Sequence, residues 1–181
     1  MKDDIRRRNL RTALAEDAAI AIPDELERSF QTHHALVFRT AYRITGNAAD
    51  AEDVLQTVFL RLLRRGSAAD ALEKEESYLR RAAINAALDV VRARQADRSV
   101  ELVDMSAGPR QGSALELRQA LAKALAQLEP RRAEIFVLRF LEGFENPEIA
   151  RLLGISQVLV AVLVHRTRQQ LRKELRRYLG T

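Results

Sequence analysis

Cysteine and tryptophan are absent from the 181-residue chain, and histidine occurs only three times. Without cysteine the chain has neither a disulfide framework nor a thiolate site. A metal site built on so few histidines would need carboxylates at matching spacing, so we expect no metal ion. The chain also lacks a glycine-rich phosphate loop and a nucleophile motif. We therefore expect no catalytic activity and no cofactor.

Glycine and proline are few, seven and four residues, and aromatic residues make up only 5% of the chain. Hydrophobic residues nevertheless account for 47%, with Ala, Leu, Arg and Glu dominant. This composition disfavours a β-rich architecture and predicts an all-α protein. The length suits two small helical domains, each with a modest core.

Long hydrophobic runs are also missing, because no stretch of about 18 apolar residues occurs that could span a bilayer. The first residues, "MKDDIRRRNLRTALAED", mix both charges and contain no apolar core for secretion. We expect a cytoplasmic protein with no membrane insertion.

Basic residues outnumber acidic ones, and most of the basic residues are arginine. The net charge is +5 and the isoelectric point is near 10.1. A basic chain favours anionic partners, nucleic acid among them. The 25 acidic residues keep the excess moderate, so charge alone does not decide the function.

The domain plan follows from where the helical periodicity holds. Residues 1–22 form an N-terminal extension, 23–96 a first helical domain and 114–181 a second. Between them, residues 97–113 contain "MSAGPRQGS", which concentrates Gly, Pro and Ser. We expect this segment to be a flexible linker and the two domains to move independently in the free protein.

The clearest helix of the first domain ends at Gly66 and begins with Asn47 or Asp50 as its N-cap. Its first turn is acidic and its last turn basic, as the helix dipole favours. Its buried stripe is expected to contain Val54, Leu55, Val58, Leu62 and Phe59. A polar segment then leads to another helix from Tyr78. Its buried face is expected to carry Leu79, Ala83, Ala86 and Val90, and its other face is rich in arginine.

The second domain should contain four helices, the first of them stopped by Pro130. "NPEIARLLG" predicts a short helix capped by Asn146, and Gly154 a tight turn before a longer helix with a basic end. This is the pattern of a helix-turn-helix, in which the second helix enters the major groove of DNA.

Two segments resemble one known family, the small two-domain bacterial sigma factors of the extracytoplasmic-function group. "AYRITGNAADAEDVLQTVFLRLLRR" resembles the family's segment that binds RNA polymerase core, and "YLRRAAINAALDVVRAR" the segment that melts and reads the minus-ten element. "ALAQLEPRRAEIFVLRFLEGFENPEIARLLGIS" is similar to the domain that reads the minus-thirty-five element. The resemblance implies a sigma factor that binds RNA polymerase core and promoter DNA.

The resemblance also implies roles for individual residues. Polymerase core would be bound by Asp53, Gln56, Thr57 and Arg61. Minus-ten DNA would be bound by Tyr78, Arg80, Arg81, Asn85, Arg92 and Arg94. Minus-thirty-five DNA would be bound by Gln157, Arg166, Arg168, Arg172 and Lys173. Without the resemblance, many of these side chains would be interpreted as solvated charges on helix surfaces.

The chain departs from the family at three places. Thr57 stands where an acidic residue is frequent, and Tyr78 where a tryptophan is common. The largest departure is in the last helix, which carries Val158, Leu159, Val162 and Leu163 where small or polar residues are usual.

Val158 and Val162 fall nearly opposite the expected core of the helix, so they predict an exposed apolar surface. This leaves open an alternative function, a sigma-derived protein-interaction module with a degenerate DNA-reading helix. Its apolar surface would contact an anti-sigma protein or a second copy of the chain.

Overall fold

The computed structural model describes residues 24–65, 72–101 and 114–176, and every regular element in these ranges is an α-helix. The predicted all-α class is therefore confirmed. The predicted N-terminal extension, 1–22, and most of the predicted linker lie outside the described residues. The helices are α2 (Asp24–Thr45), α3 (Ala48–Arg65), α4 (Leu72–Glu101), α5 (Ala114–Ala126), α6 (Pro130–Phe140), α7 (Asn146–Leu153) and α8 (Gln157–Glu174).

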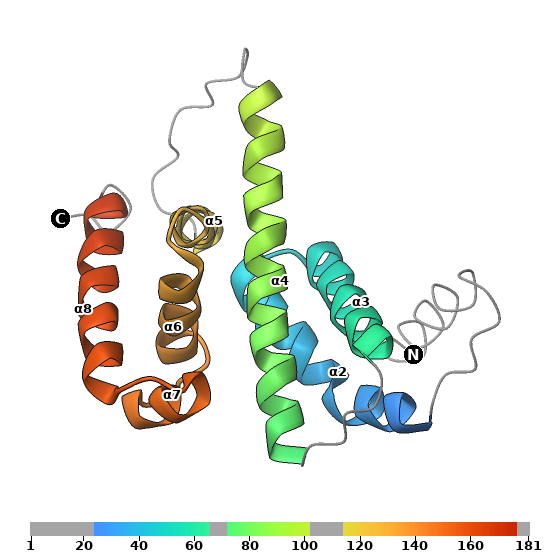
Figure 1. Cartoon of the computed structure of the whole chain (residues 1–181). Helices are drawn as coiled ribbons and strands as arrows, with labels where there is room; N and C mark the ends of the chain where they lie inside the picture. The colour runs from blue at the N-terminus through green and yellow to red at the C-terminus, as the bar shows by residue number, and fades with distance from the viewer. Residues whose placement is uncertain (1–23, 66–71, 102–113, 177–181) are drawn as a thin grey trace.

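The N-terminal unit consists of α2, α3 and α4, packed against one another (Figure 1). Helix α2 is one continuous helix, and Gly46 ends it with a left-handed φ of 66°. The side chain of Asn47 caps α3, because its Oδ1 accepts from the backbone N–H of Ala49 at 2.8 Å. The four residues Val54, Leu55, Val58 and Phe59 of the predicted stripe are buried, and Leu62 is half-buried.

Helix α4 is longer at both ends than the sequence indicated. It begins at Leu72 within the predicted polar segment, and it continues to Glu101, past the predicted linker boundary at residue 97. Polarity is a poor guide here, because Glu, Lys, Arg and Gln favour helix as strongly as apolar residues do. An ion pair between Glu76 and Arg80, one turn apart at 2.6 Å, supports the first turns.

The C-terminal unit consists of α5 to α8. Pro130, which was predicted to stop the preceding helix, is the first residue of α6. The side chain of Glu129 caps α6. The expectation that Asn146 caps α7 is wrong, since the N-cap is Glu145 and Asn146 already belongs to the helix. The backbone N–H of Glu145 donates to Oε2 of Glu148 at 2.6 Å.

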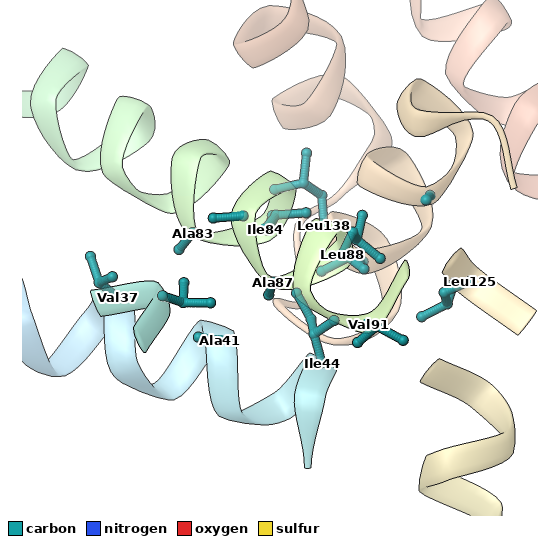
Figure 2. Close-up of a cluster of buried hydrophobic side chains, with 14 of the residues drawn as sticks. Val37, Ala41, Ile44, Ala83, Ile84, Ala87, Leu88, Val91, Leu125 and Leu138 are labelled. Carbon is teal, nitrogen blue, oxygen red and sulfur yellow. The ribbon is translucent and has the colours of Figure 1, made fainter. Parts of the chain in front are cut away.

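The two units pack together, an arrangement that the sequence analysis did not predict. Helix α4 lies between α2 on one side and α5 and α6 on the other (Figure 1). One continuous buried cluster includes Ile44 of α2, Leu88 of α4, Leu125 of α5 and Leu138 of α6 (Figure 2). The sequence did not indicate this packing, because it depends on complementary apolar faces of helices that are far apart in the chain.

Candidate functional site

The outer face of α3 carries the four residues predicted to bind polymerase core. Asp53 and Arg61 are exposed, and Gln56 and Thr57 are half-buried. Within the described residues α3 packs mainly on α2 and α4, through the stripe opposite these side chains. The arrangement therefore presents a mixed acidic, amide and basic surface, which suits specific docking on another protein.

The second half of α4 holds two of the arginines predicted to bind minus-ten DNA. Arg94 pairs with Asp50 of α3 at 2.5 Å, so Asp50 is an ion-pair partner and not the cap of its helix. Arg92 pairs with Asp89 at 2.9 Å, and its Nε donates to the backbone carbonyl oxygen of Ala126 at 3.1 Å. Both guanidinium groups thus have protein partners.

The first half of α4 holds two more of these arginines, and both reach the C-terminal unit. Arg80 pairs with Glu142 in the α6–α7 connection, and its guanidinium lies 5.1 Å from the centre of the Phe144 ring. Arg81 pairs with Glu134 of α6 at 2.7 Å. The remaining minus-ten candidates, Tyr78 and Asn85, are half-buried on the same helix.

Helices α7 and α8 form the predicted helix-turn-helix, with an angle of 111° between them. Gly154 ends α7 with a left-handed φ of 63°, and the side chain of Ser156 caps α8 by accepting from the N–H of Leu159 at 3.2 Å. Arg132 of α6 fixes the orientation of α8. Its guanidinium donates to the hydroxyl of Thr167 at 3.3 Å and to the amide oxygen of Gln170 at 3.0 Å.

The outer face of α8 is apolar in its first turns and basic in its last. Val158, Leu159 and Val162 are exposed by 74%, 43% and 39%, while Leu163 is half-buried on one flank. Arg166, Arg172 and Lys173 line an open hollow of about 890 Å³ farther along the helix. Gln157 and Arg168 are also exposed. The helix thus brings the minus-thirty-five candidates onto its solvent side, next to an apolar patch.

Three residues that the sequence analysis did not single out connect the two units. They are Arg43 of α2, Glu134 of α6 and Glu142 of the α6–α7 connection. The sequence carries one signal for Glu134, because it stands between apolar residues in "RRAEIFVLRF" and is buried with them. A charge inside an apolar stripe indicates a buried ion pair.

Neither a metal centre nor a simple membrane span is found within the described ranges. No group of three or more metal-ligating side chains occurs among those residues. No single described helix is both long and apolar enough to cross a bilayer, and only the bent pair α7 and α8 reaches that composition jointly. That pair is the helix-turn-helix.

Comparison with known proteins agrees with this architecture. Residues 30–97 match the sigma-70 region 2 family, and residues 118–171 match the sigma-70 region 4 family. The extracytoplasmic-function (ECF) RNA polymerase sigma factor SigL of Mycobacterium tuberculosis is 30% identical over 169 residues, which cover 90% of this chain and 96% of that protein. The chain therefore belongs to the ECF sigma factors.

Further relatives belong to the same family. The ECF RNA polymerase sigma factor SigE of Mycolicibacterium smegmatis is 34% identical over 174 residues, which cover 92% of this chain and 66% of that protein. Among solved structures, the sigma factor RpoE of Bartonella quintana, crystallised with the anti-sigma factor NepR, aligns with a TM-score of 0.48 at 19% identity. That alignment covers 84% of this chain and 97% of the other.

Proposed function

We propose that this chain is a promoter-specificity subunit of RNA polymerase, which binds the core enzyme and directs initiation at particular promoters. The observation that carries the proposal is the presence of both sigma-70 regions in one chain, in order, each on its own group of packed helices. A repressor of the helix-turn-helix type would account for the C-terminal unit and would leave the N-terminal unit without a role.

Each unit has a part in this function. The polar face of α3, with Asp53, Gln56, Thr57 and Arg61, docks on the core enzyme. The arginines of α4 hold the displaced strand in the minus-ten region, where basic groups and a ring such as that of Tyr78 favour unstacked bases. The basic end of α8 follows the phosphates of the minus-thirty-five duplex.

The chain contributes binding and no reaction of its own, because bond formation belongs to the polymerase. Its partners, core polymerase and promoter DNA, are in the cytoplasm, and we place the chain there. Its arginines are suited to phosphate, which they bind with two parallel hydrogen bonds.

The test is transcription with purified core polymerase on a pool of genomic fragments from the source organism. The full chain should give transcripts whose 5′ ends follow a shared pair of upstream elements, whereas core enzyme alone should give no such set. Transcripts without a shared element, or none above core enzyme alone, would contradict the proposal.

A second candidate function is favoured by the apolar patch on α8. Val158 is 74% exposed at the place where a base-reading side chain would lie. Such a patch suits contact with an anti-sigma protein or a second copy of the chain. Under this alternative the chain still binds polymerase but selects promoters poorly, so the transcripts would start without regard to upstream sequence.

A further inference from the structure

Helix α8 carries, on its exposed side, a polar side chain that the sequence analysis did not single out. Gln169 is exposed and is one of the residues that line the hollow near the end of α8. At about 100° per residue, the direction of Gln169 falls between those of Val158 and Val162. Gln169 therefore continues the face of the helix that begins with the apolar patch.

The hollow gives Gln169 a strongly cationic setting. Its other lining residues are Arg166, Gln170, Arg172, Lys173 and Arg176. Phosphate contacts from such cations fix the position of a protein on a duplex but carry no sequence information. An uncharged amide among these cations is suited to the complementary task, because amides form hydrogen bonds with base edges.

Of the two glutamines in the hollow, Gln170 is already engaged within the protein. Its Oε1 accepts a hydrogen bond from Arg132 of α6 at 3.0 Å, and its Nε2 donates to Glu174 at 3.0 Å. Both ends of that amide therefore hold α8 in place. Gln169 is the member of the pair that is left for a ligand.

Gln169 contacts His165, which lies one turn earlier on α8. Nε2 of Gln169 is 2.9 Å from Nε2 of His165, and both side chains are exposed. When the imidazole carries its proton on Nδ1, its Nε2 accepts one hydrogen of the amide. The amide then keeps its oxygen and its second hydrogen, which are an acceptor and a donor side by side.

An acceptor beside a donor matches the edge of adenine in the major groove. The N6 amino group of adenine donates to the amide oxygen, and its N7 accepts the amide hydrogen. Guanine presents two acceptors at the same place, so its O6 would face the amide oxygen. An amide held in one orientation therefore distinguishes adenine from guanine, which Val158 and Val162 cannot do.

We propose that Gln169 reads an adenine of the minus-thirty-five duplex through two hydrogen bonds, and that His165 is a positioning residue that holds the amide in the reading orientation. The cations of the hollow fix the register on the phosphates. Base selection then lies about two turns along α8 from Val162, beyond the apolar patch. This inference rests on the proposed function and names a residue that gives it specificity.

The measurement is the selection of duplexes by the full chain from a pool with a randomised centre, with sequencing of the bound and the input DNA. The parent should enrich a motif in which one A·T pair is preferred by about tenfold. Gln169→Ala should lose the preference at that pair alone. It should bind an unselected duplex as the parent does, because the cations remain.

Gln169→Glu gives the same position a different preference. A carboxylate only accepts hydrogen bonds, and the base edge that suits it is the N4 amino group of cytosine. The preferred pair should therefore change from A·T to C·G at that position and stay the same elsewhere in the motif.

Two variants of His165 separate positioning from reading. His165→Ala frees the amide, and ordering it again on DNA should reduce the preference for adenine by about threefold. His165→Gln should keep most of the preference, because its amide oxygen can accept from Gln169 one turn away. Adenine should remain the preferred base in both variants.

The matched control is Gln119→Ala, which removes an exposed amide from α5 of the same unit. This variant should enrich the motif of the parent. A change in its motif equal to that of Gln169→Ala would overturn the proposal, because the loss would then not depend on the place of the amide.

A parent that enriches no motif would also overturn the proposal. So would a motif that Gln169→Ala leaves unchanged, or His165 variants that prefer another base. Promoter-dependent transcripts together with any of these results would leave the sigma function standing and the reading role wrong. A motif that depends on Gln169, without such transcripts, would support the reading role and contradict the function.

Discussion

Glu142 receives guanidinium groups from two helices of the other unit while only 1% of its side chain is exposed. Moving a carboxylate out of water costs several kcal/mol, which Arg43 and Arg80 offset. Such a pair is costly to break by removing one partner, but separation of the units returns both charges to water. Glu142 therefore contributes to the contact between the two units.

Asp53 and Gln56 provide the prediction at this scale. Replacing both, Asp53→Ala with Gln56→Ala, should weaken binding to core polymerase by about tenfold, because two polar contacts at an interface are each worth roughly 0.5–1.5 kcal/mol. Helical content should not change, since the buried stripe of α3 lies on its other side. Titration of labelled chain with core enzyme, beside circular dichroism, measures both.

The control for that variant is Glu25→Ala with Gln31→Ala, two exposed residues of similar chemistry on α2. It should bind core polymerase as the parent does. Equal affinity for the α3 variant and the parent would remove the reason to locate the docking surface on α3.

Helix α4 is the element for which the sequence was least informative. Its periodicity indicated one apolar stripe, including Leu79 and Ala83, and an opposite face of arginines. The structure buries that stripe against α2 and α3 and buries Ile84 and Leu88 against the C-terminal unit. A helix that packs on two sides has two apolar faces. In the sequence, the second face looks like a few extra apolar residues on an ordinary surface helix, so it is not recognised.

The ends of α3 and the helix-turn-helix could be predicted closely, because local chemistry fixes them. Asn47 and Gly154 act on their own neighbours in the chain, through a cap and a left-handed turn. The cap of α8, Ser156, acts equally locally but was not singled out. The pairing of Arg81 with Glu134 joins residues 53 positions apart. No local signal indicates that partner, although a buried Glu on α6 indicates that some partner exists.

Helix α8 provides the prediction at the scale of the element. Its basic end should supply most of its duplex affinity, and its apolar first turns should discriminate bases weakly, since Val and Leu touch thymine methyls but cannot make bidentate hydrogen bonds. Arg166→Ala with Lys173→Ala should lower the salt slope of duplex binding by about two, at roughly 0.9 for each phosphate contact. Binding of the full chain to a duplex across salt concentrations measures this slope.

The matched variant is Val158→Ala with Val162→Ala, which shortens the exposed patch and leaves the charges in place. It should keep the salt slope and change the preference for a selected promoter over a scrambled duplex by less than about 1 kcal/mol. A large loss of preference would mean that these side chains read the sequence directly. An unchanged salt slope in the Arg166 and Lys173 variant would mean that other residues contact the phosphates.

At the scale of the whole molecule, the features needed to initiate transcription are distributed over two units that share one core. The face of α3 that we propose for polymerase binding and the outer face of α8 are open to solvent, while Ile84 and Leu88 of α4 are buried in the core that the two units share. The sequence predicted the order of these parts through its resemblance to a family. It did not predict their packing, which depends on contacts between segments far apart in the chain.

The most direct test of this account is the distance between the units in two states. The chain has no cysteine, so Gln31→Cys on α2 and Lys123→Cys on α5, both exposed, provide two unique labelling sites. Pulsed electron paramagnetic resonance should give one defined distance in the free chain and a longer distance in the complex with core polymerase and promoter DNA. The same distance in both states would contradict the claim that both units engage promoter elements that lie far apart on the DNA.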